Sequence, residues 1–185
     1  MELQYPVFWR NASSKRKRIY LIIIVFIIAF VVTVIGSYVP LSHSDAQTIY
    51  NQENATLTSH KSSFGSLTAY LFINNFSLCL LMFVPFIGLI VGMFIIFDSG
   101  LALGAISIVK GYPPVVALII EVILPIFWLE FLCYSVAMAE SVWLSRRLMQ
   151  RRWYELKNTA ILIGVCAAIL LGSAALEAWL IGIGV

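Results

Sequence analysis

The chain has 185 residues, of which 61% are hydrophobic and 11% are charged, and its mean hydropathy is +0.95. A soluble domain of this length needs much more polar surface, so the composition excludes a soluble globular protein. It predicts one integral membrane domain over residues 1–185. The net charge of +3 comes from two basic clusters beside apolar runs. Such clusters are typical of anchors next to anionic lipid, so we expect the bilayer, and no nucleic acid, as the partner.

The two basic clusters also predict the orientation. The first lies in residues 1–18, a basic N-terminus that we expect in the cytoplasm, and the second lies in residues 146–157. The apolar run over residues 19–41 carries no charge and is long enough to cross the membrane. It is too long for the core of a signal peptide and precedes no small-residue cleavage site. We predict a retained helix, followed by a polar extracytoplasmic loop over residues 40–66.

The number of later crossings follows from parity. If both basic clusters are cytoplasmic, an even number of crossings separates them. The first run and residues 115–144 supply two, so residues 62–110 supply two more, or none as a re-entrant pair. A last apolar run over residues 158–185 ends the chain. We predict an all-α polytopic bundle of about five segments in the cell membrane, with broken or re-entrant helices in the middle and an extracytoplasmic C-terminus.

Glycine and proline are concentrated between residues 85 and 125. The pairs Gly88/Gly92 and Gly100/Gly104 have the small-x-x-x-small spacing that lets membrane helices approach closely. Tight packing is one interpretation. The other is broken helices that line a site or pore, as in transporters, because irregular backbone at membrane depth needs shielding by protein or water.

Several acidic residues lie in or beside apolar runs, where no lysine or arginine is deep enough to pair with most of them. We expect Asp98 and Glu140 to reach an interface, and Glu121, Glu130 and Glu177 to lie deeper. Deep carboxylates without cations usually face the protein interior, hydrogen-bonded or protonated.

Pro125 and Glu130 form the most unusual pair, in the stretch LPIFWLEF. Proline cannot donate to the carbonyl at residue 121, so we predict a bend at Pro125. Glu130 needs a hydrogen-bond donor, water or a proton, and we expect it to tie the bent helix to its neighbours. A tolerated kink beside a water-exposed acid is the alternative.

These motifs together resemble the stage II sporulation protein M family. That family has an Asn-Asn pair, an Asn-Gly-x-x-x-Gly turn, a Pro-His-Gly-x-x-Glu motif and a helix with A-x-I-E-A. The chain has Asn74-Asn75, Ser99-Gly100-Leu-Ala-Leu-Gly104, Pro125 through Glu130 with Ile126-Phe127 for His-Gly, and Ala174-Ala175-Leu176-Glu177-Ala178. The resemblance implies five membrane segments, a cytoplasmic N-terminus and a scaffold-like role in a membrane complex. The missing histidine argues against histidine-dependent chemistry.

No pattern typical of an enzyme is present. There is no His-x-x-x-His or Cys-x-x-Cys pair, and both histidines lie in the polar loop, away from the membrane serines. The spacing of the acidic residues does not exclude catalysis by a pair of carboxylates. We predict no catalytic residue, no metal and no cofactor, and a scaffold or accessory subunit that binds other membrane proteins or a second copy. The alternative is a small transporter or channel component that uses its intramembrane carboxylates.

Overall fold

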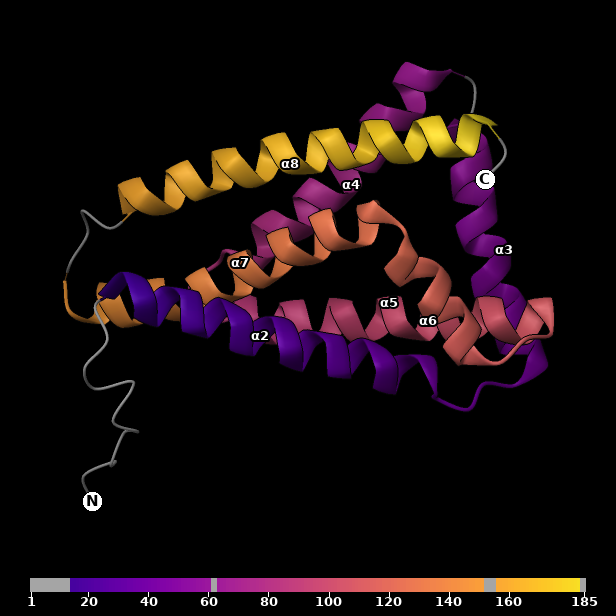
Figure 1. The fold of residues 1–185 in the computed structure, drawn as a ribbon, viewed down its shortest axis with the longest axis horizontal. Helices are drawn as coiled ribbons and strands as arrows, with labels where there is room; N and C mark the ends of the chain where they lie inside the picture. Colours follow the sequence, from indigo (N-terminus) through magenta and orange to yellow (C-terminus); the bar gives the residue numbers. More distant parts are fainter. Residues whose placement is uncertain (1–13, 61–62, 152–155, 184–185) are drawn as a thin grey trace.

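A computed structural model describes residues 14–60, 63–151 and 156–183, which form helices and contain no strand (Figure 1). The helices are α2 (Ser14–Ser37), α3 (His43–His60), α4 (Phe64–Met82), α5 (Gly88–Lys110), α6 (Pro114–Ile123), α7 (Pro125–Met149) and α8 (Leu156–Ile183). Among them α2, α4, α5, α7 and α8 are long and apolar enough to cross a membrane. The all-α multi-pass architecture with five membrane segments is therefore confirmed.

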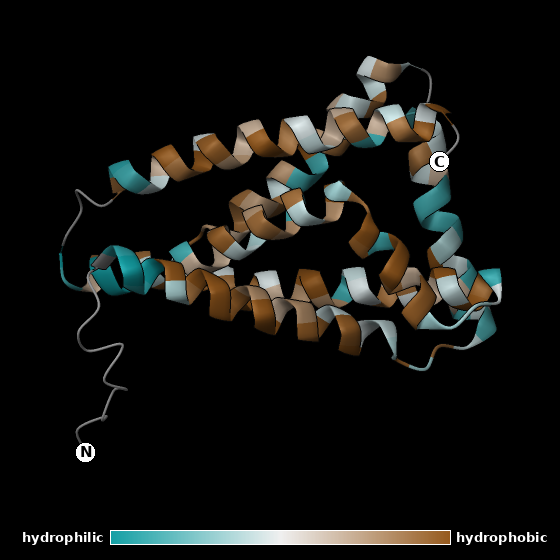
Figure 2. Cartoon of the chain, in the orientation of Figure 1, coloured by the Kyte–Doolittle hydropathy of each residue, from teal (hydrophilic) through white to brown (hydrophobic). Residues whose placement is uncertain are grey.

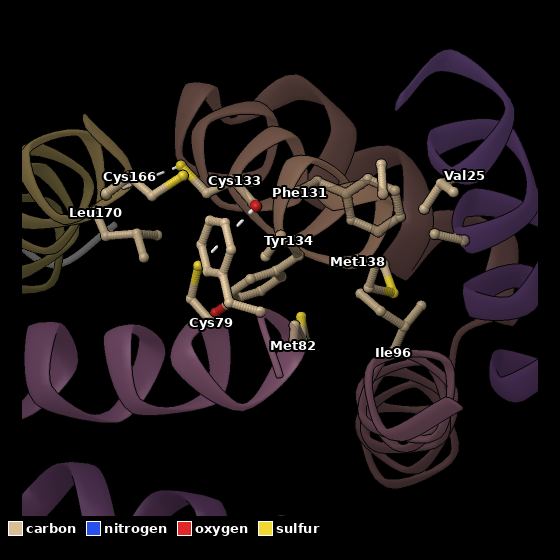
Figure 3. Close-up of a cluster of buried hydrophobic side chains, with 14 residues drawn as sticks. Val25, Cys79, Met82, Ile96, Phe131, Cys133, Tyr134, Met138, Cys166 and Leu170 are labelled. Atoms are coloured by element: carbon tan, nitrogen blue, oxygen red, sulfur yellow. Dashed lines mark hydrogen bonds between the residues drawn. The ribbon is translucent and has the colours of Figure 1, made fainter. Parts of the chain in front are cut away.

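Helix α7 is the centre of the bundle. In its most apolar stretch 61% of the residues are buried, against 17–28% in the other spanning helices. It packs against α2, α4, α5, α6 and α8, and Figure 1 shows α2 and α8 on opposite sides of it. Cys133, Tyr134 and Met138 of α7 form the middle of the main core, between Cys79 of α4 and Ile96 of α5 (Figure 3). Burial of this kind stabilises a membrane bundle through close packing.

Both basic clusters lie at the same end of the bundle. Lys17 of α2 and Arg146 and Arg147 of α7 line one small cavity there, together with Trp143. Figure 2 shows hydrophilic residues at the start of α2 and, at the opposite end, along α3. Between the two clusters the chain crosses through α2, α4, α5 and α7, an even number, so residues 62–110 supply two full crossings. Residues 1–13, which include part of the basic N-terminus, lie outside the described residues.

The polar stretch predicted as a loop over residues 40–66 is largely helical, which corrects the sequence prediction. Helix α3 begins after Ser42, whose hydroxyl accepts a hydrogen bond from the Asp45 backbone N–H and donates one to the Asp45 carboxylate. This is an N-terminal cap of the Ser-x-x-Asp type. No glycine or proline interrupts the helix, and Ala46 is fully buried. The polar composition of this segment was therefore not sufficient evidence that it lacks helical structure.

The bend predicted at Pro125 is a complete break between α6 and α7. Leu124 is extended, with φ −77° and ψ 132°, and Pro125 is the first residue of α7. A proline at this position is favourable because its missing N–H would have no helical partner anyway. The Glu121 carbonyl, predicted to lack a bond, accepts one from Leu124 N at 3.1 Å. The indole of Trp128 donates to the Val122 carbonyl at 2.8 Å, so two of the carbonyls at the broken end of α6 accept hydrogen bonds.

Candidate functional site at Glu130

Glu130 joins three helices at one carboxylate oxygen. It projects from the second turn of α7, where Asn75 of α4 donates to Oε1 from Nδ2 at 2.6 Å. Ser173 of α8 donates to the same oxygen from its hydroxyl at 3.2 Å. Asn74 extends the chain of polar groups through a 3.4 Å bond from its Nδ2 to Asn75 Oδ1. Because an amide and a hydroxyl are neutral donors, this arrangement can hold either the ionised or the protonated acid.

Two more of the predicted acids lie near Glu130. Glu177 is one turn beyond Ser173 on α8, and Glu121 lies in the last turn of α6, just before the break that precedes α7. Glu121 and Glu177 are half-buried and make no side-chain hydrogen bond within the described part of the chain. Among the described residues, no group of three or more histidine, cysteine, aspartate or glutamate side chains is arranged so that it could hold a metal ion. Three half-buried acidic side chains, on α6, α7 and α8, thus lie in this region of the bundle.

Glu140, which the sequence placed at an interface without a role, makes a second three-helix contact at the basic end of α7. Its Oε1 accepts from Arg18 Nη2 of α2 at 3.0 Å and from the Thr159 hydroxyl of α8 at 2.8 Å. Arg18 also lies 5.2 Å from the centre of the Trp143 ring, and Arg147 lies 4.6 Å from it, within the range of cation–π attraction. The expectation that both basic clusters lie on the cytoplasmic side, from which the parity argument started, was the sequence signal for this pairing.

The four glycines predicted as close-approach positions all face another helix or turn. A side-chain carbon added at Gly104 would lie 2.7 Å from the Ser37 carbonyl oxygen of α2, and one at Gly100 would overlap the backbone of Thr33. At Gly88 such a carbon would overlap the carbonyl of Met82, and at Gly92 the side chain of Met138. These glycines therefore serve close packing.

Gly36 is a fifth such position, which the sequence interpretation missed. A side-chain carbon there would overlap the Phe97 carbonyl oxygen of α5. Its neighbours Thr33 and Ser37 have the same small-x-x-x-small spacing on α2, which was the available signal.

Asp98 lies apart from the other acids and differs from its expected place. The structure puts it ten residues after Gly88 in a helix that ends at Lys110, so it is near the middle of a spanning helix and not at an interface. Its side chain is exposed and makes no hydrogen bond or ion pair within the described residues. Ile90 and Phe94 on the two preceding turns are 71% and 72% exposed. Asp98 thus points outward from the bundle, on an apolar helix face.

Residues 20–180 match the family described as Stage II sporulation protein M. No curated protein and no solved structure matches the chain significantly. The matched residues include all of α3 to α7 and most of α2 and α8. Of the motifs that carried the resemblance, the asparagine pair and Glu130 are joined by hydrogen bonds, and Glu177 lies one turn beyond Ser173, which also bonds Glu130. Gly100 and Gly104 pack against α2.

Proposed function

Because the chain belongs to the Stage II sporulation protein M family, we propose that it is a non-catalytic scaffold or accessory subunit that holds another membrane protein within the bilayer. The described chain is almost wholly helix of membrane-spanning length, with α3 as its one long polar element. A partner is therefore held chiefly by the surfaces of spanning helices. The observation that carries this proposal is the position of Asp98.

A carboxylate that faces lipid at the middle of a spanning helix costs several kcal/mol, about 2.5–3.5 on insertion scales. Glu130 and Glu140 avoid this cost through donors from neighbouring helices. Asp98 has no donor within the described chain. A partner helix that presents an amide, hydroxyl or basic side chain at the same depth would supply one. The flanking apolar side chains, Ile87, Ile90 and Phe94, would pack against that helix.

The test is a purification of the full chain from its native membranes in mild detergent, with Asp98→Asn and Asp98→Leu beside the wild type. The proposal expects one set of membrane proteins to co-purify with the wild type, to be retained with Asn, and to be lost with Leu. Val31→Leu, at an exposed apolar position of α2, is the matched control. Equal recovery with all three variants would contradict the proposal.

The orientation is part of the same proposal. We propose that the basic end of the bundle, with Lys17, Arg146 and Arg147, faces the cytoplasm, because positive charge is in excess on that side of membranes. Helix α3 and the C-terminal end of α8 then lie outside. An impermeant thiol reagent on intact cells should label Asn51→Cys on α3 and spare Gln150→Cys. Labelling of Gln150→Cys alone would reverse the orientation.

A small transporter is the second candidate, and the cluster of Glu121, Glu130 and Glu177 beside the broken α6–α7 segment is the observation that favours it. Intramembrane acids near discontinuous helices are typical of ion pathways. The purified chain reconstituted alone in liposomes separates the two functions. A scaffold moves no ion or solute, whereas a transporter moves one and loses that flux with Glu130→Gln while it stays folded.

A further inference from the structure

A cavity of about 440 Å³ lies near the basic end of the bundle, away from both Glu130 and Asp98. Ala139 and Glu140 of α7 form its floor, and α2 and α8 form its two walls. The apolar wall residues are Ile19 and Ile22 on α2 and Ile161 and Leu162 on α8. Ile19 and Ile161 are 55% and 59% exposed, so the cavity is open along the outside of the bundle. We call it the α2–α8 groove.

The groove lies at the depth where lipid headgroups meet acyl chains. Lys15 and Arg18 line it just before Ile19, the first residue of the uncharged run of α2. Asn158 lines it at the start of α8, before the apolar part of that helix. One end of the groove is therefore polar and the other apolar, with the same direction as a phospholipid in the bilayer. Exposed isoleucine walls at this depth favour a hydrocarbon occupant over water.

The charge of the groove favours an anion. The one carboxylate in its lining, Glu140, is bonded by Arg18 and Thr159, so its charge is already balanced by a cation. Lys15 is exposed at the rim and forms no ion pair or hydrogen bond within the described chain. Each basic side chain close to a membrane surface attracts anionic lipid by about 1 kcal/mol.

The size of the groove argues against a protein helix as its occupant. One turn of an α-helix about 10 Å wide and 5.4 Å high occupies roughly 420 Å³. The groove would thus hold about one turn, too little to secure a spanning helix. It lies within the range of about 300–1,000 Å³ that is typical of sites for single small ligands, so it can cover one acyl chain and the adjoining phosphate of a phospholipid while the second acyl chain stays in the bilayer.

From these observations we propose that the α2–α8 groove binds one anionic phospholipid. Its phosphate lies beside Lys15 and Asn158, and one acyl chain lies between Ile22 and Leu162 over Ala139. Such a lipid would fill the space between α2 and α8 and brace the Arg18–Glu140–Thr159 contact from outside. This site is independent of the proposed scaffold function, because it uses neither Asp98 nor the Glu130 site.

The test uses the full chain in nanodiscs of phosphatidylcholine with and without phosphatidylglycerol. Native mass spectrometry after release into detergent measures which lipid the protein retains, and thermal unfolding measures whether phosphatidylglycerol raises the Tm. The wild type should retain phosphatidylglycerol in preference to phosphatidylcholine. Lys15→Gln should reduce that preference about fivefold, the change expected for one basic side chain. Ile161→Trp should fill the groove and abolish retention of either lipid.

Two matched controls separate the groove from general attraction to the basic end. Lys17 lies on the same helix at a similar depth but lines the cavity beside Trp143, so Lys17→Gln should reduce the preference much less than Lys15→Gln does. Leu171→Trp, at an exposed position of α8 outside the groove, should leave retention unchanged. Variants are compared only where circular dichroism and size-exclusion profiles match the wild type. Equal effects of Lys15→Gln and Lys17→Gln, or equal retention of the two lipids by the wild type, would overturn the proposal. A rise in Tm with soluble glycerol phosphate alone would overturn it too, since the site would then not require a lipid.

Discussion

Two glutamates on α7 hold that helix to its neighbours in different ways. Glu140, at the basic end, accepts from the guanidinium of Arg18 and from a hydroxyl. Glu130, ten residues earlier, accepts from an amide and a hydroxyl. At the basic end Arg18, whose side chain is 24% exposed, brings its charge to the buried carboxylate of Glu140. Deeper in the bundle neutral donors satisfy the acid, and they need no negative charge to do so. The comparison therefore predicts that charge is required at residue 140 and only hydrogen bonding at residue 130.

The largest expected effect is the loss of Glu140. Glu140→Leu leaves Arg18 and Thr159 without their shared acceptor, and breaking a buried ion pair from one side typically costs 3–5 kcal/mol. Because Arg18 is 24% exposed, we expect the lower end, about 3 kcal/mol in the free energy of unfolding, measured by denaturant titration in micelles. Arg18→Leu added to Glu140→Leu should recover part of the loss, since the uncompensated cation is then gone. If Glu140→Leu is as stable as the wild type, the ion pair does not hold α2 to α7.

Exchange of each glutamate for glutamine tests the comparison directly. Glu130→Gln keeps an oxygen that can accept from Asn75 and Ser173, so we expect a change within about 0.5 kcal/mol, the range of substitutions that remove no essential interaction. Glu130→Leu leaves both donors unpaired and should cost about 1–3 kcal/mol. Glu140→Gln should be costly as well, because it removes the negative charge with which Arg18 forms its ion pair. Equal costs for the two glutamine variants would show that the two sites do not differ in their need for charge.

The sequence predicted the main elements of this comparison but not the partners. The spacing from Pro125 to Glu130 identified the break and the acid beside it, because proline has a fixed effect on a helix. Asn75 and Ser173 lie 55 and 43 residues from Glu130 in the chain. Which faces of α4 and α8 meet α7 depends on how the three helices rotate and cross, and that is decided by packing over their whole length.

Asp98 and helix α3 are two places where the structure differs from the sequence prediction, and hydropathy alone could not have identified either. Asp98 was expected at an interface because its apolar run was divided at that point, but the close fit of Gly36 against Phe97 and of Gly100 against Thr33 continues α5 through residue 98. Helix α3 was missed because its residues are polar, although the Ser42–Asp45 cap was visible in the sequence. Packing and local capping, and not hydropathy, determined both elements.

Removal of a hydroxyl donor on α8 should cost more unfolding free energy at Thr159, which binds Glu140, than at Ser173, which binds Glu130. Thr159→Val removes a 2.8 Å bond to the acid that is paired with Arg18, and hydrogen bonds to charged groups contribute about 1.5–3 kcal/mol. Ser173→Ala removes a longer, 3.2 Å bond, and we expect about 0.5–1.5 kcal/mol. Unfolding of the two variants in the same micelles compares them. Ser77→Ala, at an exposed position of α4, is the control, and a larger loss for Ser173→Ala than for Thr159→Val would reverse the comparison.

The smallest effect concerns the helix break, which is present at the Glu130 end of α7 and absent at the Glu140 end. Trp128→Phe keeps an aromatic ring but removes the indole N–H that donates to the Val122 carbonyl. Because the Trp128 side chain is 46% exposed, we expect a loss of about 0.5 kcal/mol, the low end for one hydrogen bond. Trp179→Phe, at a similarly exposed position of α8, should change less. If the break positions Glu130, the effects of Trp128→Phe and Glu130→Leu should not add, whereas those of Trp128→Phe and Glu140→Leu should. Full additivity in both pairs would mean that the break and Glu130 stabilise the bundle independently.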